Sequence, residues 1–394
     1  MSIRLKMVLS IVLVFVLGMA SLWFFLERSY TTRVDAAAAS AIQGASTAFA
    51  RLQQAEADKL SSTLIGLQSN AAFRDPFLAG DREALNAAAQ PVFAGLKADH
   101  GVTHWYFESV PPSGTVILRV HKPEQFGDVL TRKTYIAASA NETQSAGLEL
   151  GKTAVALRVV RPYYGADGKL IGYMELGQEI DSFLDAIRQQ TGDEVGLLLK
   201  KESMDSSGWA AVAKQNGRPD NWSDQEDFVL AGSTNEALSA DIIKTDGLTA
   251  VGKDGKVFGV FEGDAGGSET RGAFPIMDAA GVPIGLMYIQ HDISTVVDEI
   301  QSTRIRMMGA VATMMVVVLA VVLLLMNGLI FRRLNHMISD MEGISTRVAG
   351  GDYDVSYTPT GNNDEIGHFE HFYSDFITMV GGALKQLSDS MKKQ

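Results

Sequence analysis

Residues suited to binding an acidic ligand recur at alternate positions of one predicted strand. The segment Thr115 to His121 alternates apolar and polar residues, which is typical of a half-buried strand. Residues two apart in a strand share a face. The pattern therefore predicts a core-facing set, Val116, Leu118 and Val120, and an opposite set, Ile117, Arg119 and His121. Because an arginine offers a planar fork of donors that fits a carboxylate, we expect Arg119 and His121 to contact a small organic acid.

Further candidates lie on the neighbouring predicted strands. His104, Tyr106 and Glu108 alternate on the preceding strand. The other side chains expected near the ligand are Tyr135, Arg158, Arg161, Tyr173 and Glu175. The competing interpretation is that these are ordinary solvent-facing side chains, since arginine and histidine are common on exposed strand faces.

An internal repeat organises the strands that carry these residues. Arg158 to Ile187 and Arg271 to Ile300 align at a constant offset without a gap, and ten of thirty positions are identical. Each copy predicts a strand, a glycine-containing turn, a strand and a helix. Arg158 recurs as Arg271, which favours a structural role for that arginine. Arg161 and Glu175 become Phe274 and Tyr288, so we expect the first copy to bind the ligand, because unpaired polar groups are costly to bury.

Two apolar segments predict transmembrane helices at 7–26 and 307–331. The first holds twenty residues and no charge, which matches the roughly 30 Å hydrocarbon core. It is longer than the ~7–15 residues usual in a signal peptide, so an anchor is favoured over a cleaved leader. Residues 1–6 form a short tail, and residues 27–79 form a stalk that is helical to about Asn70.

Several classes of function are disfavoured. The net charge of −12 argues against nucleic acid as a partner. With no cysteine, disulfides, thiolate metal sites and cysteine nucleophiles are absent. The run Ala146 to Thr153 resembles a phosphate-binding loop but has alanine at the first glycine position, and we expect a turn that precedes a strand. We expect no enzyme activity, no cofactor and no metal.

The loop between the two spans resembles a double-Cache sensor, a pair of PAS-like modules found outside the membrane in bacterial chemoreceptors and sensor kinases. The resemblance covers roughly residues 30–300 and includes the stretch Val116 to Asp128. It implies an α+β fold with a membrane-distal module at 80–192 and a membrane-proximal module at 193–300. In that family the ligand lies on the sheet face that carries Arg119.

Residues 332–388 resemble a HAMP domain. Leu334, Ile338, Met341, Ile344 and Val348 form an apolar helical seam, and Asp364, Glu365, Ile366 and Gly367 match the family's signature. Arg333 stands roughly where the family has a proline. The resemblance implies a parallel four-helix bundle made by two chains, and a cytoplasmic place for both termini. Residues 389–394 form a short tail.

The sequence therefore predicts a homodimeric receptor of the cytoplasmic (inner) membrane, with residues 27–306 outside the cytoplasm. A small organic acid would bind the distal module. HAMP would pass the signal to an output protein, as in chemotaxis or two-component systems, or to the output part of a longer chain. The alternative is an envelope interaction protein, whose outer region binds another protein and whose HAMP only dimerises.

Overall fold

The computed structural model describes residues 3–215, 218–263, 266–361 and 363–392. Their contacts form two units. The larger is Tyr30–Ile300, and the smaller combines Met1–Ser29 with Gln301–Gln394. The outermost residues of the two predicted tails, 1–2 and 393–394, lie outside the described residues.

Three helices open the larger unit. Helix α1 (Ile3–Gln68) enters this unit at Tyr30 and is continuous to Gln68. Helix α1 thus ends within two residues of Asn70, where the sequence predicts the end of the stalk's helix, and Asn70 caps a separate helix α2 (Ala71–Ala79) in the rest of the region 27–79. Helix α3 (Arg82–His100) follows, and the side chain of Asp81 accepts a hydrogen bond from the Ala84 N–H at its start.

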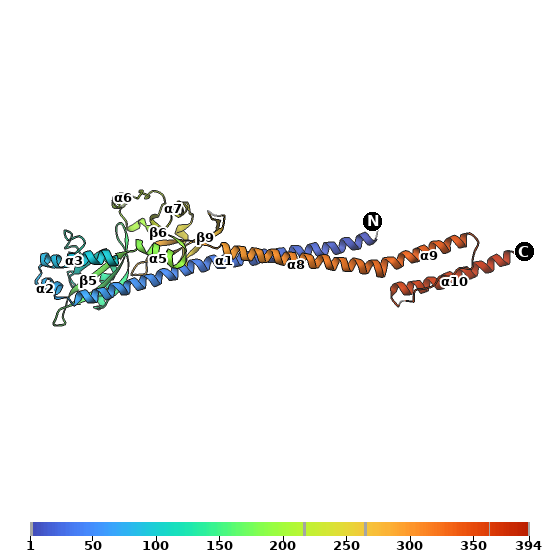
Figure 1. Ribbon diagram of the computed structural model, residues 1–394, viewed down its shortest axis with the longest axis horizontal. Helices are drawn as coiled ribbons and strands as arrows, with labels where there is room; N and C mark the ends of the chain where they lie inside the picture. The colour runs from blue at the N-terminus through green and yellow to red at the C-terminus, as the bar shows by residue number, and fades with distance from the viewer. Residues whose placement is uncertain (1–2, 216–217, 264–265, 362, 393–394) are drawn as a thin grey trace. The chain divides into compact units, whose positions relative to one another are not determined.

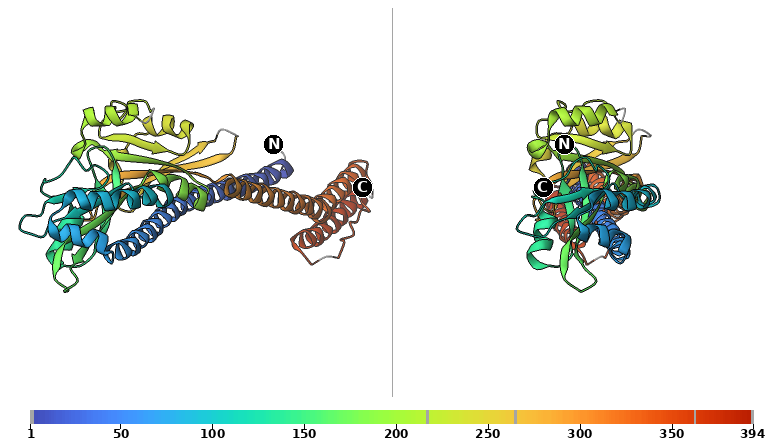
Figure 2. Two further views of the ribbon diagram at one scale, coloured as in Figure 1. Left: turned by 60° about the vertical axis from the view of Figure 1, so that its left-hand side comes forward. Right: turned by 90° about the vertical axis from the view of Figure 1, so that its left-hand side faces the viewer.

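The larger unit contains two antiparallel sheets of five strands each (Figures 1 and 2). The first sheet has the order β2-β1-β5-β4-β3. Its strands are β1 (His104–Glu108), β2 (Val116–Arg119), β3 (Ser145–Leu150), β4 (Val155–Tyr164) and β5 (Leu170–Glu179). Helix α4 (Lys133–Asn141) connects β2 to β3, and α5 (Asp181–Thr191) leads to the second sheet.

The second sheet has the order β7-β6-β10-β9-β8, which repeats the topology of the first. Its strands are β6 (Glu194–Lys200), β7 (Phe228–Ser233), β8 (Lys256–Glu262), β9 (Ser268–Met277) and β10 (Pro283–Asp292). Short 3₁₀ turns at Lys201–Ser203 and Leu248–Ala250 and helices α6 (Ser206–Gln215) and α7 (Glu236–Ile243) lie in its connections. The α+β class is thus confirmed.

The gapless repeat has a direct structural counterpart. Its first copy forms β4, β5 and α5, and its second forms β9, β10 and the start of α8, as predicted. The repeat pair Gly172 and Gly285 lies where strands approach closely. A Cβ would stand 2.5 Å from the Glu108 carbonyl oxygen at Gly172 and 2.2 Å from that of Leu198 at Gly285. Both positions therefore require glycine.

One hydrophobic core joins both sheets to α1. Leu60 and Leu64 of α1 are fully buried in the same cluster as Trp105 of the first sheet and Leu197 of the second. The ring of Phe49 packs between Phe183 of α5 and Phe274 of β9, at centroid distances of 6.3 and 6.0 Å. Helix α1 therefore contributes to the core beneath both sheets.

One prediction about an individual strand is wrong, and another holds only in part. The pairing of β1 with β2 carries a bulge, so that Leu118 opposes Phe107 but Val116 opposes Glu108. A bulge breaks the simple alternation of faces. Val116 consequently joins Tyr106 on the polar face, while Ile117 packs against the main core. The segment that resembles a phosphate loop is a turn before a strand only in its second half. Ser145–Leu150 is the edge strand β3, and the turn that follows, in which the Gly151 N–H donates to the Ala154 carbonyl at 2.8 Å, leads into β4.

The smaller unit contains the apolar parts of two long helices. Helix α8 (Ser294–Met326) continues through a π-helical turn (Asn327–Phe331) into α9 (Arg332–Ala349). Val8–Gln68 and Ser294–Ala349 are long and apolar enough to cross a membrane. Near one end of these segments the guanidinium of Arg304 lies 2.9 Å from Glu27 and 4.2 Å from the ring centroid of Trp23.

Helix α9 is followed by an extended connector and α10 (Glu365–Lys392). Met337, Ile344, Val355, Tyr357 and Tyr373 form the buried cluster between them. Ile338 is half exposed, so Met337 takes the position that the predicted seam gave to Ile338. Arg333 contacts Asp364 at 2.6 Å and the buried Glu370 at 3.3 Å.

Candidate functional site

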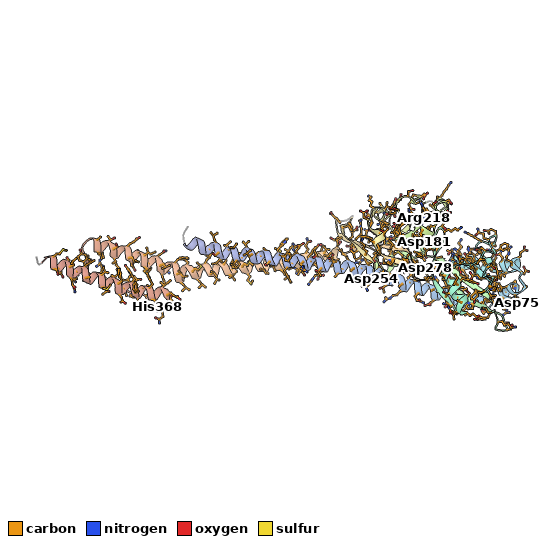
Figure 3. All side chains as sticks on the ribbon, turned by 180° about the vertical axis from the view of Figure 1, so that it is seen from behind. Asp75, Asp181, Arg218, Asp254, Asp278 and His368 are labelled. Carbon is orange, nitrogen blue, oxygen red and sulfur yellow. The ribbon has the colours of Figure 1, made fainter. Side chains whose placement is uncertain are left out.

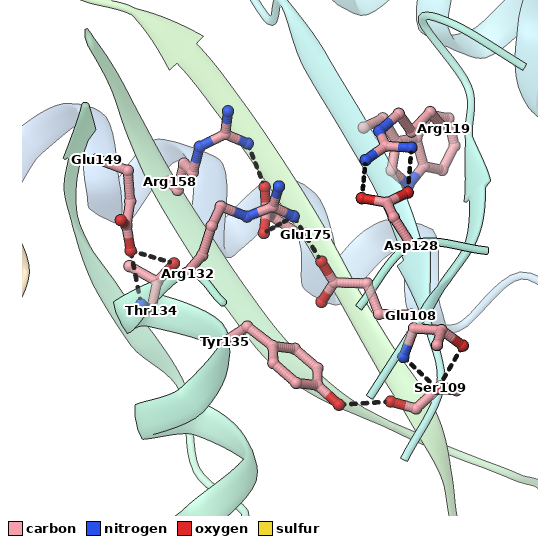
Figure 4. A network of polar contacts seen from close by, with 12 residues as sticks. Glu108, Ser109, Arg119, Asp128, Arg132, Thr134, Tyr135, Glu149, Arg158 and Glu175 are labelled. Atoms are coloured by element: carbon pink, nitrogen blue, oxygen red, sulfur yellow. Dashed lines mark hydrogen bonds and ion pairs between the residues drawn. The ribbon is translucent and has the colours of Figure 1, made fainter. Parts of the chain in front are cut away.

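A cluster of buried charges lies on the face of the first sheet that α4 covers (Figure 4). Glu108 comes from β1, Glu175 from β5 and Arg158 from β4, and Arg132 immediately precedes α4. The two glutamate side chains are fully buried. The pairing of β1 with β5 sets Tyr106 opposite Glu175 and Glu108 opposite Tyr173, and this register brings the carboxylates together.

Arg132 connects the two carboxylates. One of its terminal nitrogens lies 2.9 Å from Glu108 Oε1 and 2.9 Å from Glu175 Oε2. Arg158 donates a further hydrogen bond to Glu175 Oε1. Glu175 therefore has two cationic partners and Glu108 has one.

This difference shifts the pKa values of the two carboxyl groups in opposite directions. Burial, and then the neighbouring Glu175 charge, raise the pKa of Glu108 well above its usual range. Burial also opposes ionisation of Glu175, but Arg132 and Arg158 outweigh it and lower the pKa of that carboxyl. The pair thus consists of an ionised Glu175 and a neutral Glu108, a common outcome when two carboxyl groups share one site.

Three arginines surround the ring of Tyr106. The guanidinium carbons of Arg132, Arg158 and Arg119 lie 4.3, 5.4 and 5.5 Å from its centroid. Arg119 forms a bidentate pair with Asp128, with nitrogen-to-oxygen distances of 2.7 and 2.6 Å. Three guanidinium groups therefore face the carboxylates of Asp128 and Glu175 and the carboxyl of Glu108, whose pKa burial raises.

Two histidines border the same cluster and stay uncharged. The rings of His104 and His121 meet edge to face at 4.7 Å. Burial is the main reason that the pKa of His104 falls to about 2 and that of His121 to about 4. His121 Nδ1 accepts the backbone N–H of Trp105 at 3.3 Å, which leaves Nε2 to carry the proton.

Helix α4 forms a lid over the cluster and is held at three points. Besides Arg132, Tyr135 donates a hydrogen bond of 2.7 Å to the Ser109 carbonyl. Glu149 of β3 accepts the backbone N–H of Thr134 at 2.7 Å and its hydroxyl at 3.1 Å. Burial raises the pKa of Glu149, and the two bonds from Thr134 partly offset that rise.

Several buried polar atoms of this cluster have no hydrogen-bond partner among the described residues. They are Glu108 Oε2, the Nε atoms of Arg132 and Arg158, and the Tyr173 hydroxyl. Buried polar atoms are normally paired with protein, water or ligand. The cluster therefore has unused donors at both arginines and at Tyr173, and an unused oxygen at Glu108.

The structure brings together six of the seven predicted ligand-binding residues: Tyr106, Arg119, His121, Tyr135, Tyr173 and Glu175. Arg161 lies apart from them, because it is three residues from Arg158 and so faces the other side of β4. There it contacts Gln144 at 2.5 Å and Ser61 of α1 at 3.3 Å.

The sequence did not point to Arg132. It marked Glu108 and Arg158 as candidates but did not predict that they form the centre of the cluster. Arg132 lies outside any strand or helix, so no periodicity marks it. The available signal was indirect: two carboxylates on facing strand positions require nearby cations.

The same face of the second sheet is filled by apolar side chains. The repeat places Ala273, Leu286 and Tyr288 where the first sheet has Val160, Tyr173 and Glu175, and all three belong to a buried hydrophobic cluster. Arg271, the counterpart of Arg158, is held by Asp241 at 2.8 Å and by Glu269. The two modules thus share a fold but differ in the chemistry of this face.

Comparison with known proteins links the fold to sensory domains. Residues 36–228 match the model of the dCache_3 family, described as the double sensory domain of two-component sensor kinases. Together with the two antiparallel sheets, this match supports a double-Cache sensor domain. Cache sensor domains of membrane receptors lie outside the cytoplasm, and two apolar helices flank this one. No curated protein matches the chain.

Several solved structures are similar to the chain at low identity. The periplasmic domain of Vibrio cholerae LuxQ is 13% identical, with a TM-score of 0.36, covering 65% of this chain and 99% of that one. The Escherichia coli DcuS sensor domain is 20% identical, with a TM-score of 0.29, covering 36% and 97%. The ligand-binding domain of the Campylobacter jejuni chemoreceptor Tlp3, in complex with L-valine, is 12% identical, with a TM-score of 0.34, covering 71% and 96%.

Proposed function

We propose that this chain is a transmembrane receptor that binds a small carboxylate-bearing molecule in its first module. The observation that carries the proposal is the convergence of three guanidinium groups on the Tyr106 ring. The unused donors of Arg132 and Arg158 favour an anion. A carboxylate accepts paired N–H groups of this kind in a planar arrangement.

The first module, about residues 80–192, is the membrane-distal sensing part in this proposal, and the second, 193–300, is the membrane-proximal transmitting part. The contrast between the polar cluster and its apolar counterpart supports that division. Residues 307–331 form the second span, and the chain lies in the cytoplasmic membrane with residues 27–306 outside.

Residues 332–388 act as a HAMP relay in this proposal. Arg333 joins the start of α9 to Asp364 of the signature and to Glu370 of α10. Side chains on α10 such as Phe372, Met379 and Leu387 are largely exposed in the single chain. Their exposure supports a homodimer in which a second copy packs against them, and the output is an effector protein or the rest of a longer chain.

The test is a binding screen on the full chain in lipid nanodiscs, against small mono- and dicarboxylates, amino acids and amines. A ligand at 100 times its Kd stabilises its site by about 2.7 kcal/mol, which shifts the thermal transition. The decisive variants are Arg158→Met and its repeat mate Arg271→Met. Loss of carboxylate affinity in the first, with affinity retained in the second, is the expected result.

Three outcomes would contradict the proposal in different ways. Equal loss of affinity in both variants would locate the ligand elsewhere. A response to amines alone would reverse the assigned charge preference. A folded chain that responds to no compound would favour the alternative, an outer region that binds another envelope protein.

A further inference from the structure

The edge strand β3 of the first sheet contacts the second module. Its outer neighbour is the turn between β9 and β10, where the backbone N–H of Ala279 donates a 3.0 Å hydrogen bond to the Leu148 carbonyl. Gly147 leaves almost no room there, since a Cβ on it would stand 2.6 Å from Ala279 Cβ. Just after β3, the Lys152 carbonyl accepts the N–H of Asp205 at 3.2 Å.

The same strand also holds the lid over the polar cluster. Glu149, the residue after Leu148, accepts the N–H and the hydroxyl of Thr134 at the start of α4. Leu148 itself is fully buried in the main core. We therefore expect a displacement of α4 that moves Glu149 to move the adjacent Leu148 carbonyl as well.

The turn that receives this contact leads directly toward the second apolar helix. Asp278, labelled in Figure 3, is its first residue, and its N–H donates to the Val282 carbonyl at 2.8 Å. Gly281 donates to the Asp278 carbonyl at 3.0 Å and has a φ of +78°. Strand β10 then begins at Pro283 and ends at Asp292, and α8 starts at Ser294.

We propose that the Leu148–Ala279 hydrogen bond couples the lid α4 to β10, and through β10 to α8. This inference rests on the proposed receptor function, because it assigns the route by which the first module acts on the second span. Coupling between sites travels through packed and hydrogen-bonded elements that respond together. Here the elements are α4, β3, the β9–β10 turn and β10.

The internal repeat supplies a matched control. The equivalent turn of the first module is Gly165–Gly168, in which Gly168 donates to the Gly165 carbonyl at 3.0 Å. Its Ala166 corresponds to Ala279 and is likewise exposed, but its N–H has no partner among the described residues. Both alanines occupy the second position of a four-residue turn, where proline is favoured. Proline at either position keeps the turn, but only Ala279→Pro removes a contact between modules.

The experiment measures hydrogen–deuterium exchange on the full chain in nanodiscs, without any ligand. Thr134→Val removes the hydroxyl bond between α4 and Glu149, and Glu149→Ala removes both bonds. Each is combined with Ala279→Pro or Ala166→Pro. We expect the lid variants to speed exchange of the β10 amides by at least about twofold in the wild-type and Ala166→Pro backgrounds. In the Ala279→Pro background we expect no change.

An equal response of β10 in both proline backgrounds would overturn the proposal. So would lid variants that loosen α4 but leave β10 unchanged, or lid variants that leave α4 itself unchanged. Because no ligand enters the measurement, its failure leaves the binding screen unaffected, and failure of the screen leaves this result standing.

Discussion

Glu108 and Glu175 lie on adjacent strands and share the guanidinium of Arg132, which is 2.9 Å from each carboxylate. Glu175 has the additional partner Arg158, whereas one oxygen of Glu108 has no partner among the described residues. The asymmetry means that loss of Arg132 affects the two carboxyl groups unequally. Glu175 keeps one cation, and Glu108 loses its only one.

Arg132→Ala is therefore expected to destabilise the larger unit by about 1–3 kcal/mol, the usual cost of leaving a buried polar group unpaired. Urea unfolding of the full chain, followed by tryptophan fluorescence, measures the change. Lys169→Ala is the control, because Lys169 forms an exposed pair with Asp167 and such pairs contribute about 0–1 kcal/mol. Similar losses in both variants would contradict the central role of Arg132.

His121 predicts a dependence of stability on pH. In the folded protein its pKa is lowered from 6.5 to about 4, chiefly by burial. Between these values the unfolded chain takes up a proton that the folded chain does not, so the free energy of unfolding falls as the pH falls. His104 acts in the same direction, with a pKa lowered to about 2.

The measurement is the unfolding free energy from pH 7 to pH 4, for the wild type and for His121→Gln. One proton accounts for up to about 1.4 kcal/mol per pH unit. The wild-type curve should be steeper than that of the variant by up to this amount. Parallel curves would show that His121 titrates normally in the folded state.

Gly285→Ala is expected to destabilise the second module by about 1–3 kcal/mol, because the added methyl group overlaps the Leu198 carbonyl and the strands must shift. Gly95→Ala is the matched control. Gly95 lies within α3 with no atom within 4 Å of the added Cβ, so this change should stabilise by about 0.5–1 kcal/mol. Denaturant unfolding shows whether each variant is less or more stable than the wild type.

The absence of cysteine from the sequence permits a direct test of topology. Ala166→Cys and Ser390→Cys introduce single thiols at exposed positions of the larger unit and of α10. A membrane-impermeant maleimide should label the first in intact spheroplasts, and the second only after permeabilisation. The opposite pattern would invert the proposed orientation.

The regular parts of the fold were predictable because they follow a period. The repeat predicted β4, β5 and α5 together with β9, β10 and α8, since alternation and glycine turns are local signals. The bulge between β1 and β2 made the predicted faces of Val116 and Ile117 wrong, because one extra residue reverses the faces of the residues beyond it. The extra residue lies in β2 itself, because one step along β1 from Phe107 to Glu108 faces two steps along β2 from Leu118 to Val116, and nothing in the sequence of β2 marks it.

Most of the candidate site could be predicted from residues on or next to strands, whereas Arg132, in a connecting segment, could not. Tyr106, Tyr173 and Glu175 meet because the pairing of β1 with β5 sets them side by side. Arg132 reaches them from a connecting segment, whose path depends on tertiary packing. Arg161 was assigned to the wrong face of β4. It lies three positions after Arg158, and strand residues an odd number of positions apart point to opposite faces.

The π-helical turn at Asn327–Phe331 fixes the rotational phase of α9 relative to α8. Such a turn accommodates one residue more than an α-helical turn does. Each residue of an α-helix advances the chain by 1.5 Å and by about 100°. Deleting one residue here would turn every side chain of α9 through about that angle about the helix axis while the helix remained continuous. This short segment is thus a point at which evolution or design can reset the direction that α9 presents to its neighbours.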